Sequence, residues 1–185
     1  MLSLPYPTGS LLIAVSLLPS LQALYNGYIY GLLYLYFEAY PLVFSDRHGF
    51  NEGQLGLAYI PIVIGTMCAF VAHHWQNKFY LRKKRENGGR TVPEARLAWA
   101  LFGGPIFALA LFWFAFTTYP QVPWPAPLMS GLPFGFGTMV IYMAAVSFVT
   151  DSYSTDGASA LAGVSLVRSG MGAGFPVFAT AMYEK

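Results

Sequence analysis

The chain has 185 residues, of which 56% are hydrophobic, 17% aromatic and only 10% charged, and its formal net charge is +2. A water-soluble domain carries about 25% charged residues, so this composition indicates a protein whose main solvent is lipid. Nucleic acid is not an expected partner, because the cations cluster in one segment. The single cysteine, Cys68, excludes a framework of disulfides within the chain.

Three long stretches carry no Asp, Glu, Lys or Arg, namely residues 1–37, 53–77 and 97–150. A core helix of a soluble protein has no reason to avoid charge for so long, whereas a helix that crosses a bilayer needs about 20 apolar residues. The sequence therefore predicts an all-α polytopic membrane protein, embedded in the lipid bilayer as one transmembrane domain. Its five predicted spans lie at about residues 15–43, 55–75, 96–118, 127–150 and 157–182.

The connection at residues 76–95 is predicted to face the cytoplasm. Seven of the ten Lys and Arg residues lie between Lys78 and Arg96, and cytoplasmic loops of membrane proteins are enriched in these residues. Alternation of the spans then places the connections at about residues 45–54 and 118–125 on the outside. An odd number of spans also predicts that the two ends of the chain lie on opposite sides of the membrane.

Seven short motifs occur in a fixed order along the chain and together resemble the fungal drug:proton antiporters of the major facilitator superfamily over about residues 20–183. The motifs are YGLLYLYFEAYPLVF at 30–44, PEARL at 93–97, LFWF at 111–114, DSY at 151–153, SALA at 159–162, VRS at 167–169 and FPVF at 175–178. The resemblance implies a partial C-terminal six-helix repeat of a twelve-helix transporter, from helix seven into helix eleven. It further implies a plasma-membrane protein whose intact form exports drugs or other small amphipathic compounds, driven by a proton gradient and without a bound cofactor.

The chain departs from this family at both ends. The first six helices of the family are absent, and after Tyr183 the chain gives Glu184 and Lys185 instead of a twelfth helix. We therefore expect a fragment whose partner is a missing N-terminal transporter half. Two alternatives stay open, an inactive truncated product and a non-transporting membrane subunit that associates with another transporter half. An enzyme is not expected, because no arrangement of nucleophile and base stands out.

Glu38 is the candidate for the group that carries the proton. A carboxylate costs roughly 2.5–3.5 kcal/mol at the centre of a membrane helix, so its presence calls for a partner or a water-filled cavity. Gly27, Gly31, Tyr34 and Glu38 recur at helical spacing and share one face. We expect Tyr30, Tyr34 and Glu38 to border a substrate cavity. The alternative is that Glu38 anchors the end of its helix through hydrogen bonds.

Arg168 is the second charge predicted to lie inside the membrane, near the middle of the fifth span. A guanidinium group does not lose its charge in proteins, so it needs a partner. The sequence offers Glu38, Asp151 or backbone carbonyl groups and does not choose among them. A structural or gating ion pair is one interpretation of Arg168, and direct contact with substrate is the other. Asp151 is either a gate charge or an ordinary residue of the membrane interface.

Glycine and histidine motifs in the spans have structural interpretations. The alternating glycines at 170–174 lack the strand and the Lys-Ser/Thr of a phosphate loop. With the glycine pairs at 27–31 and 131–135, they predict close packing of helices. His73 and His74 are adjacent and point about 100° apart on a helix, so no metal site is expected there.

Overall fold

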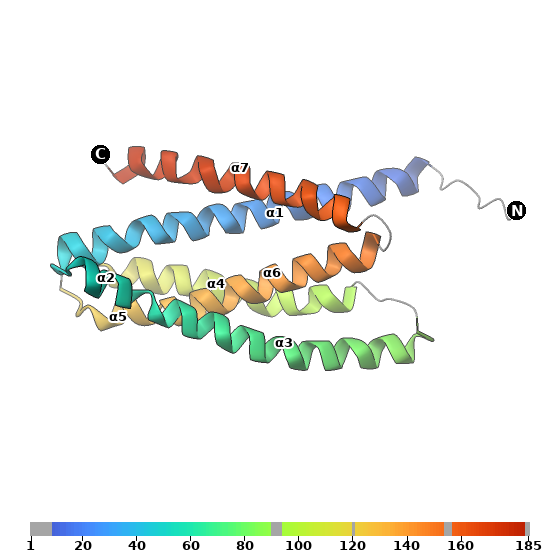
Figure 1. Cartoon of the computed structure of the whole chain (residues 1–185), viewed down its shortest axis with the longest axis horizontal. Coiled ribbons are helices and arrows are strands. Elements are labelled where there is room, and N and C mark those ends of the chain that lie inside the picture. Colours follow the sequence, from blue (N-terminus) through green and yellow to red (C-terminus); the bar gives the residue numbers. More distant parts are fainter. Residues whose placement is uncertain (1–8, 90–93, 120, 154–156, 184–185) are drawn as a thin grey trace, which may run out of the picture.

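The computed structural model of the chain is a bundle of helices that run along one long axis, and it describes residues 9–89, 94–119, 121–153 and 157–183 (Figure 1). Within these ranges every regular element is helical, which confirms the predicted all-α class. The long helices are α1 (Gly9–Pro41), α3 (Ile60–Glu86), α4 (Glu94–Thr117), α6 (Gly131–Tyr153) and α7 (Gly157–Tyr183). The short elements are a π-helical segment (Leu42–Arg47), α2 (Glu52–Ala58) and α5 (Pro125–Met129).

The connections alternate between the two ends of the bundle as the span prediction requires. Figure 1 shows α2, α5 and the last turns of α7 at one end. The first turns of α1 and α7 and the last turns of α3 lie at the other end. The basic residues on the last turns of α3 therefore share one end with the starts of α1 and α7. Which side of a membrane this end faces stays a prediction.

Helix α3 extends beyond the second predicted span, so much of the basic segment is helical. Lys78 and the cluster Arg82, Lys83, Lys84 and Arg85 lie on the last turns of α3. The helix ends where Gly88 and Gly89 take φ angles of 65° and 84°, a region that favours glycine. Lys and Arg are good helix formers, so the helix continues past the apolar stretch until these glycines stop it.

Three segments of the described chain are long and apolar enough to cross a membrane by length and composition: Glu52–Glu86, Ala95–Thr117 and Pro125–Ser152. They overlap the second, third and fourth predicted spans. Helices α1 and α7 overlap the first and fifth, but they are not among these three segments. On α4 the side chains of Leu101, Phe102 and Phe116 are 75%, 69% and 71% exposed, a surface suited to lipid.

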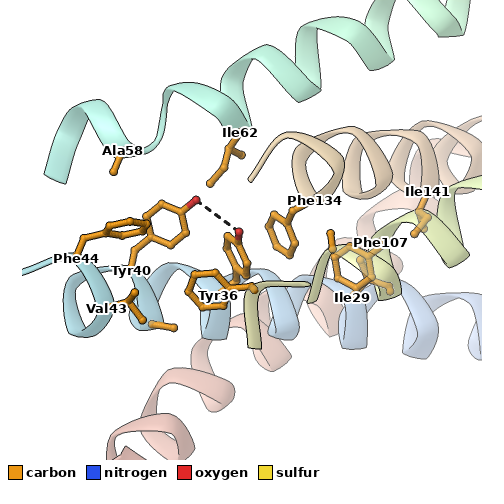
Figure 2. Close-up of a cluster of buried hydrophobic side chains, with 13 residues drawn as sticks. Ile29, Tyr36, Tyr40, Val43, Phe44, Ala58, Ile62, Phe107, Phe134 and Ile141 are labelled. Carbon is orange, nitrogen blue, oxygen red and sulfur yellow. Dashed lines mark hydrogen bonds between the residues drawn. The ribbon is translucent and has the colours of Figure 1, made fainter. Parts of the chain in front are cut away.

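The buried core consists mainly of aromatic side chains near the end that carries α2 and α5 (Figure 2). The ring of Tyr36 on α1 stacks on Phe134 of α6 with their centroids 3.8 Å apart, and its hydroxyl group lies 3.5 Å from that of Tyr40. The Tyr36 hydroxyl also lies 2.8 Å from Ser130 Oγ, which donates to the Pro127 carbonyl oxygen at 2.6 Å. These bonds satisfy polar groups in the core and join α1 to the start of α6.

Glycines set the closest approaches between helices, as predicted. A side chain on Gly65 of α3 would overlap the Leu132 carbonyl oxygen of α6, and one on Gly135 would overlap the carbonyl oxygen of Ile62. Helix α6 packs extensively on both α3 and α4, while α1 packs mainly on α7. Small residues at these crossings let the backbones approach, which supplies much of the packing energy of membrane helices.

The glycines at 170–174 fulfil the packing prediction only in part. A Cβ atom on Gly172 would lie 2.9 Å from the ring of Tyr30 and 3.2 Å from Tyr34. A Cβ atom on Gly170 or Gly174 would meet no atom of the described structure within 4 Å. Residues two apart point to different sides of a helix, so only Gly172 faces α1.

Candidate substrate cavity at Arg168

A cavity of about 210 Å³ lies between four of the long helices, partway along the bundle. Helices α1, α3, α6 and α7 each contribute to its wall, and α4 does not. The lining residues are Asn26, Ile29, Tyr30, Leu33, Thr66, Thr138, Met139, Tyr142 and Arg168. The surface that faces this space is almost entirely apolar, although six of the nine lining residues also carry a polar group. A mostly apolar wall is usual for a small-molecule site.

Helix packing between α1 and α7 places Tyr30 beside Arg168. Gly27 faces Met171 and Gly31 faces the ring of Phe175, so both glycines point toward α7. Gly172 in turn leaves room for Tyr30 and Tyr34, whose hydroxyl groups lie 3.4 Å apart. The predicted common face of α1 is therefore the face that contacts α7. Tyr30 lines the cavity directly, and Tyr34 reaches it through its hydrogen bond to Tyr30.

Aromatic rings on two helices flank the Arg168 guanidinium. Its Cζ atom lies 4.9 Å from the centroid of the Tyr30 ring and 5.3 Å from that of Tyr142. Both distances are within the range of cation–π attraction. The Nε atom of Arg168 is buried and has no hydrogen-bond partner in the described structure. Arg168 is predicted to need a partner. In the described structure its partners are the two tyrosine rings, and no carboxylate pairs with it.

Neither carboxylate named as a partner of Arg168 forms an ion pair with it in the described part of the chain. Asp151 is engaged by Arg96, as described below. Glu38 is exposed and does not line the cavity. Glu38 lies near the end of α1 that carries the π-helical segment, whereas Arg168 lies near the middle of α7. Within the described ranges no hydrogen bond anchors the Glu38 side chain either.

A second polar site joins three helices at the basic end of the bundle. Arg96 Nε lies 3.0 Å from Asp151 Oδ2, and the two side chains are only 13% and 20% exposed. The Arg96 guanidinium also lies 3.6 Å from the centroid of the Tyr80 ring and donates to Asn77 Oδ1 at 3.4 Å. Asp151 is therefore one half of an ion pair between α4 and α6.

Reasoning from the sequence missed this pair, although a signal was present. Arg96 begins the third predicted span and Asp151 follows the fourth, so consecutive antiparallel helices bring both residues to the same interface. In the residues that the structure describes, no group of three or more His, Cys, Asp or Glu side chains could hold a metal ion. His73 Nδ1 instead lies 2.9 Å from Gln76 Oε1 on the same helix.

Known proteins similar to this chain are transporters. No family model and no solved structure matches it. The major facilitator superfamily multidrug transporter mdrA of Aspergillus fumigatus is 40% identical over 164 residues, which cover 89% of this chain and 27% of mdrA. The MFS-type efflux pump MFS2 of Trichophyton rubrum is 37% identical over 89% of this chain and 28% of the pump.

An uncharacterized MFS-type transporter of Schizosaccharomyces pombe is 41% identical over 160 residues, which cover 86% of this chain and 29% of the transporter. The chain thus spans less than a third of the length of each of these three relatives. In each case the match extends over most of the chain.

Proposed function

Because the chain belongs to the major facilitator superfamily, among fungal efflux transporters, we propose that it forms part of a pump that exports small amphipathic compounds. Its Arg168 cavity is then one wall of the substrate path. Transporters of this superfamily work by rocking two halves about a site near the middle of the membrane. The partner that this mechanism requires is an N-terminal transporter half, which supplies the other wall.

The observation that carries this proposal is the position and make-up of the cavity. It lies between four helices, partway along an apolar bundle, and it holds a permanent charge beside two tyrosine rings. Its volume of about 210 Å³ is below the range of about 300–1,000 Å³ for complete ligand sites. A cavity of this size fits one wall of a larger site better than a whole drug-binding pocket.

The proposed coupling ion is the proton, and Glu38 is the proposed carrier. Its exposed position on α1 leaves the carboxyl group able to face a second transporter half. A Glu38→Gln variant removes the titratable group and keeps the shape. We expect this change to abolish proton-driven efflux at normal protein amounts, with Glu52→Gln, an exposed residue at the start of α2, as the control. Unchanged efflux in Glu38→Gln would contradict the role.

The proposed location is the plasma membrane, with the basic end of the bundle in the cytoplasm. The cations on the last turns of α3 support this orientation, since such residues are retained inside. Single cysteines at Lys84 and at Gln121, in a variant that lacks Cys68, would test it by labelling intact cells with a membrane-impermeant maleimide. We expect label at position 121 alone. Label at position 84 alone would reverse the orientation.

The experiment that tests the function is expression of residues 1–185 in an efflux-deficient yeast, with and without an N-terminal half from one of the relatives. Membrane amount and drug tolerance are scored together. We expect tolerance to rise only when both halves are present. A stable membrane signal without tolerance would contradict transport and favour a non-transporting subunit, and rapid degradation would favour an inactive product.

A further inference from the structure

We propose that the Arg168 cavity binds the carboxylate group of its ligand, so that the site selects small organic acids with an apolar body. This inference rests on the proposed function, because it names the substrate class of the same site. Its basis is the charge balance of the cavity, a buried hydrogen-bond donor of Arg168 without a partner in the described structure, and the volume and lining of the space. Each of these points is independent of how the compound is driven across the membrane.

The charge balance of the cavity is positive. Arg168 is the single charged residue of its wall, and a guanidinium stays charged in proteins. No Asp or Glu in the described ranges forms an ion pair with it. Of the other described Lys and Arg residues, Arg96 is paired with Asp151, and the rest are exposed or partly exposed toward the ends of helices. A partly buried charge without a counter-charge favours an anionic ligand and disfavours a cationic one.

The hydrogen-bonding groups of the cavity wall are suited to a ligand that accepts hydrogen bonds. Arg168 Nε is a buried donor without a partner, and the amide of Asn26, only 4% exposed, lines the same space. The hydroxyl groups of Thr66 and Thr138 already donate to the carbonyl oxygens of Val63 and Phe134. Among the lining residues, Arg168 therefore supplies the buried donor without a partner in the described structure, and Asn26 adds an amide to the same wall. A carboxylate accepts about four hydrogen bonds and matches the planar fork of a guanidinium.

The rest of the cavity is suited to a small apolar body. Ile29, Leu33 and Met139 form apolar parts of its wall. The rings of Tyr30 and Tyr142 lie close to the Arg168 guanidinium and offer aromatic surface to a planar ligand ring. The volume of about 210 Å³ admits one or two fused rings. The expected ligand is thus an aromatic or aliphatic monocarboxylic acid, or the acidic end of a larger molecule.

The test compares three probes that share one ring system and differ only in the polar group: 2-naphthoate, 2-naphthamide and 2-naphthylmethylamine. Their binding to residues 1–185 in lipid nanodiscs is measured by equilibrium dialysis at neutral pH. Nanodiscs of zwitterionic lipid without protein correct for partition into the bilayer. We expect the acid to bind about tenfold more tightly than the neutral amide, as one charge-assisted hydrogen-bond pair provides, and the amine to bind most weakly.

Variants assign this preference to the cavity. Arg168→Gln should remove the difference between acid and amide, while Arg85→Gln, an exposed cation on the end turns of α3, should preserve it. Asn26→Leu should weaken binding of the acid and leave Arg168 in place. It therefore tests the cavity even if Arg168→Gln does not fold. Equal binding of acid and amide to the natural sequence would overturn the inference. A preference that survives both cavity variants would also overturn it.

The two proposals fail separately. Preference for the acid without drug tolerance in yeast would retain the carboxylate site and reject efflux. Drug tolerance with equal binding of the three probes would retain efflux and reject the carboxylate site.

Discussion

Two arginines inside the bundle differ in what surrounds their charge. Arg96 at the basic end has a carboxylate at 3.0 Å, an aromatic ring at 3.6 Å and an amide oxygen at 3.4 Å. Arg168 near the middle of α7 has two aromatic rings and, within the described structure, a buried Nε atom without a partner. The first set of contacts is complete and holds helices together. The second is incomplete and leaves a charge available to a ligand.

The largest loss of stability is expected when the contacts of Arg96 are broken. Asp151→Ala leaves the Arg96 charge largely buried without its carboxylate, and loss of one partner of a buried pair costs about 3 kcal/mol or more. We expect the free energy of unfolding, measured by titration with SDS in mixed micelles, to fall by that amount. The exchange Arg96→Asp with Asp151→Arg should recover part of the loss. An unchanged free energy in Asp151→Ala would show that the pair does not hold the helices.

An intermediate loss of stability is expected at Gly172, where α7 packs against the tyrosines of the cavity wall. In Gly172→Ala the new methyl group would lie 2.9 Å from the Tyr30 ring and 3.2 Å from Tyr34. Displacement of these rings should cost about 1–2 kcal/mol in the same titration, as overpacking does elsewhere.

Gly170→Ala is the matched control on the same helix, because its methyl group meets open space. It should be neutral or stabilising by up to about 1 kcal/mol, since alanine favours the helix. Equal effects of the two substitutions would contradict the packing of Tyr30 and Tyr34 against Gly172.

The smallest effect on stability is expected for Arg168 itself. Arg168→Gln loses two cation–π contacts, each worth about 0.5–1 kcal/mol, but it also removes a buried charge that lacks a carboxylate. The free energy of unfolding should therefore change by less than about 1 kcal/mol, in contrast to Asp151→Ala. A loss as large as that of Asp151→Ala would mean that Arg168 is a structural residue like Arg96.

The features best predicted from the sequence are those that the apolar bilayer dictates. Long stretches without charge predict the helices. The spacing of Gly27, Gly31 and Tyr34 predicts that they share one face of α1, and in the structure this face meets α7. Even so, a pattern on one helix does not give the rotation of its neighbours. For that reason the sequence could not choose a partner for Arg168, and it suggested packing at Gly170 and Gly174, where the described structure has open space.

Ends of helices and pairs between helices were predicted less well for a related reason. The apolar stretch of α3 ends well before the helix does, because lysine and arginine continue a helix in water as readily as leucine does in lipid. The pair of Arg96 and Asp151 depends on two helix ends that meet at one depth. The sequence reveals this pair only once the order of the spans has placed Arg96 and Asp151 at the same membrane interface.

The most direct test of this contrast is an efflux measurement on Arg168→Gln and Arg96→Gln in yeast that carries both transporter halves, with the rate divided by the amount of protein in the membrane. We expect Arg168→Gln to keep a normal amount of protein and to lose efflux of a naphthoate probe. We expect Arg96→Gln to lower the amount of protein and to keep the rate per molecule. The reverse pattern, or equal loss of rate per molecule in both variants, would contradict the contrast between the two arginines.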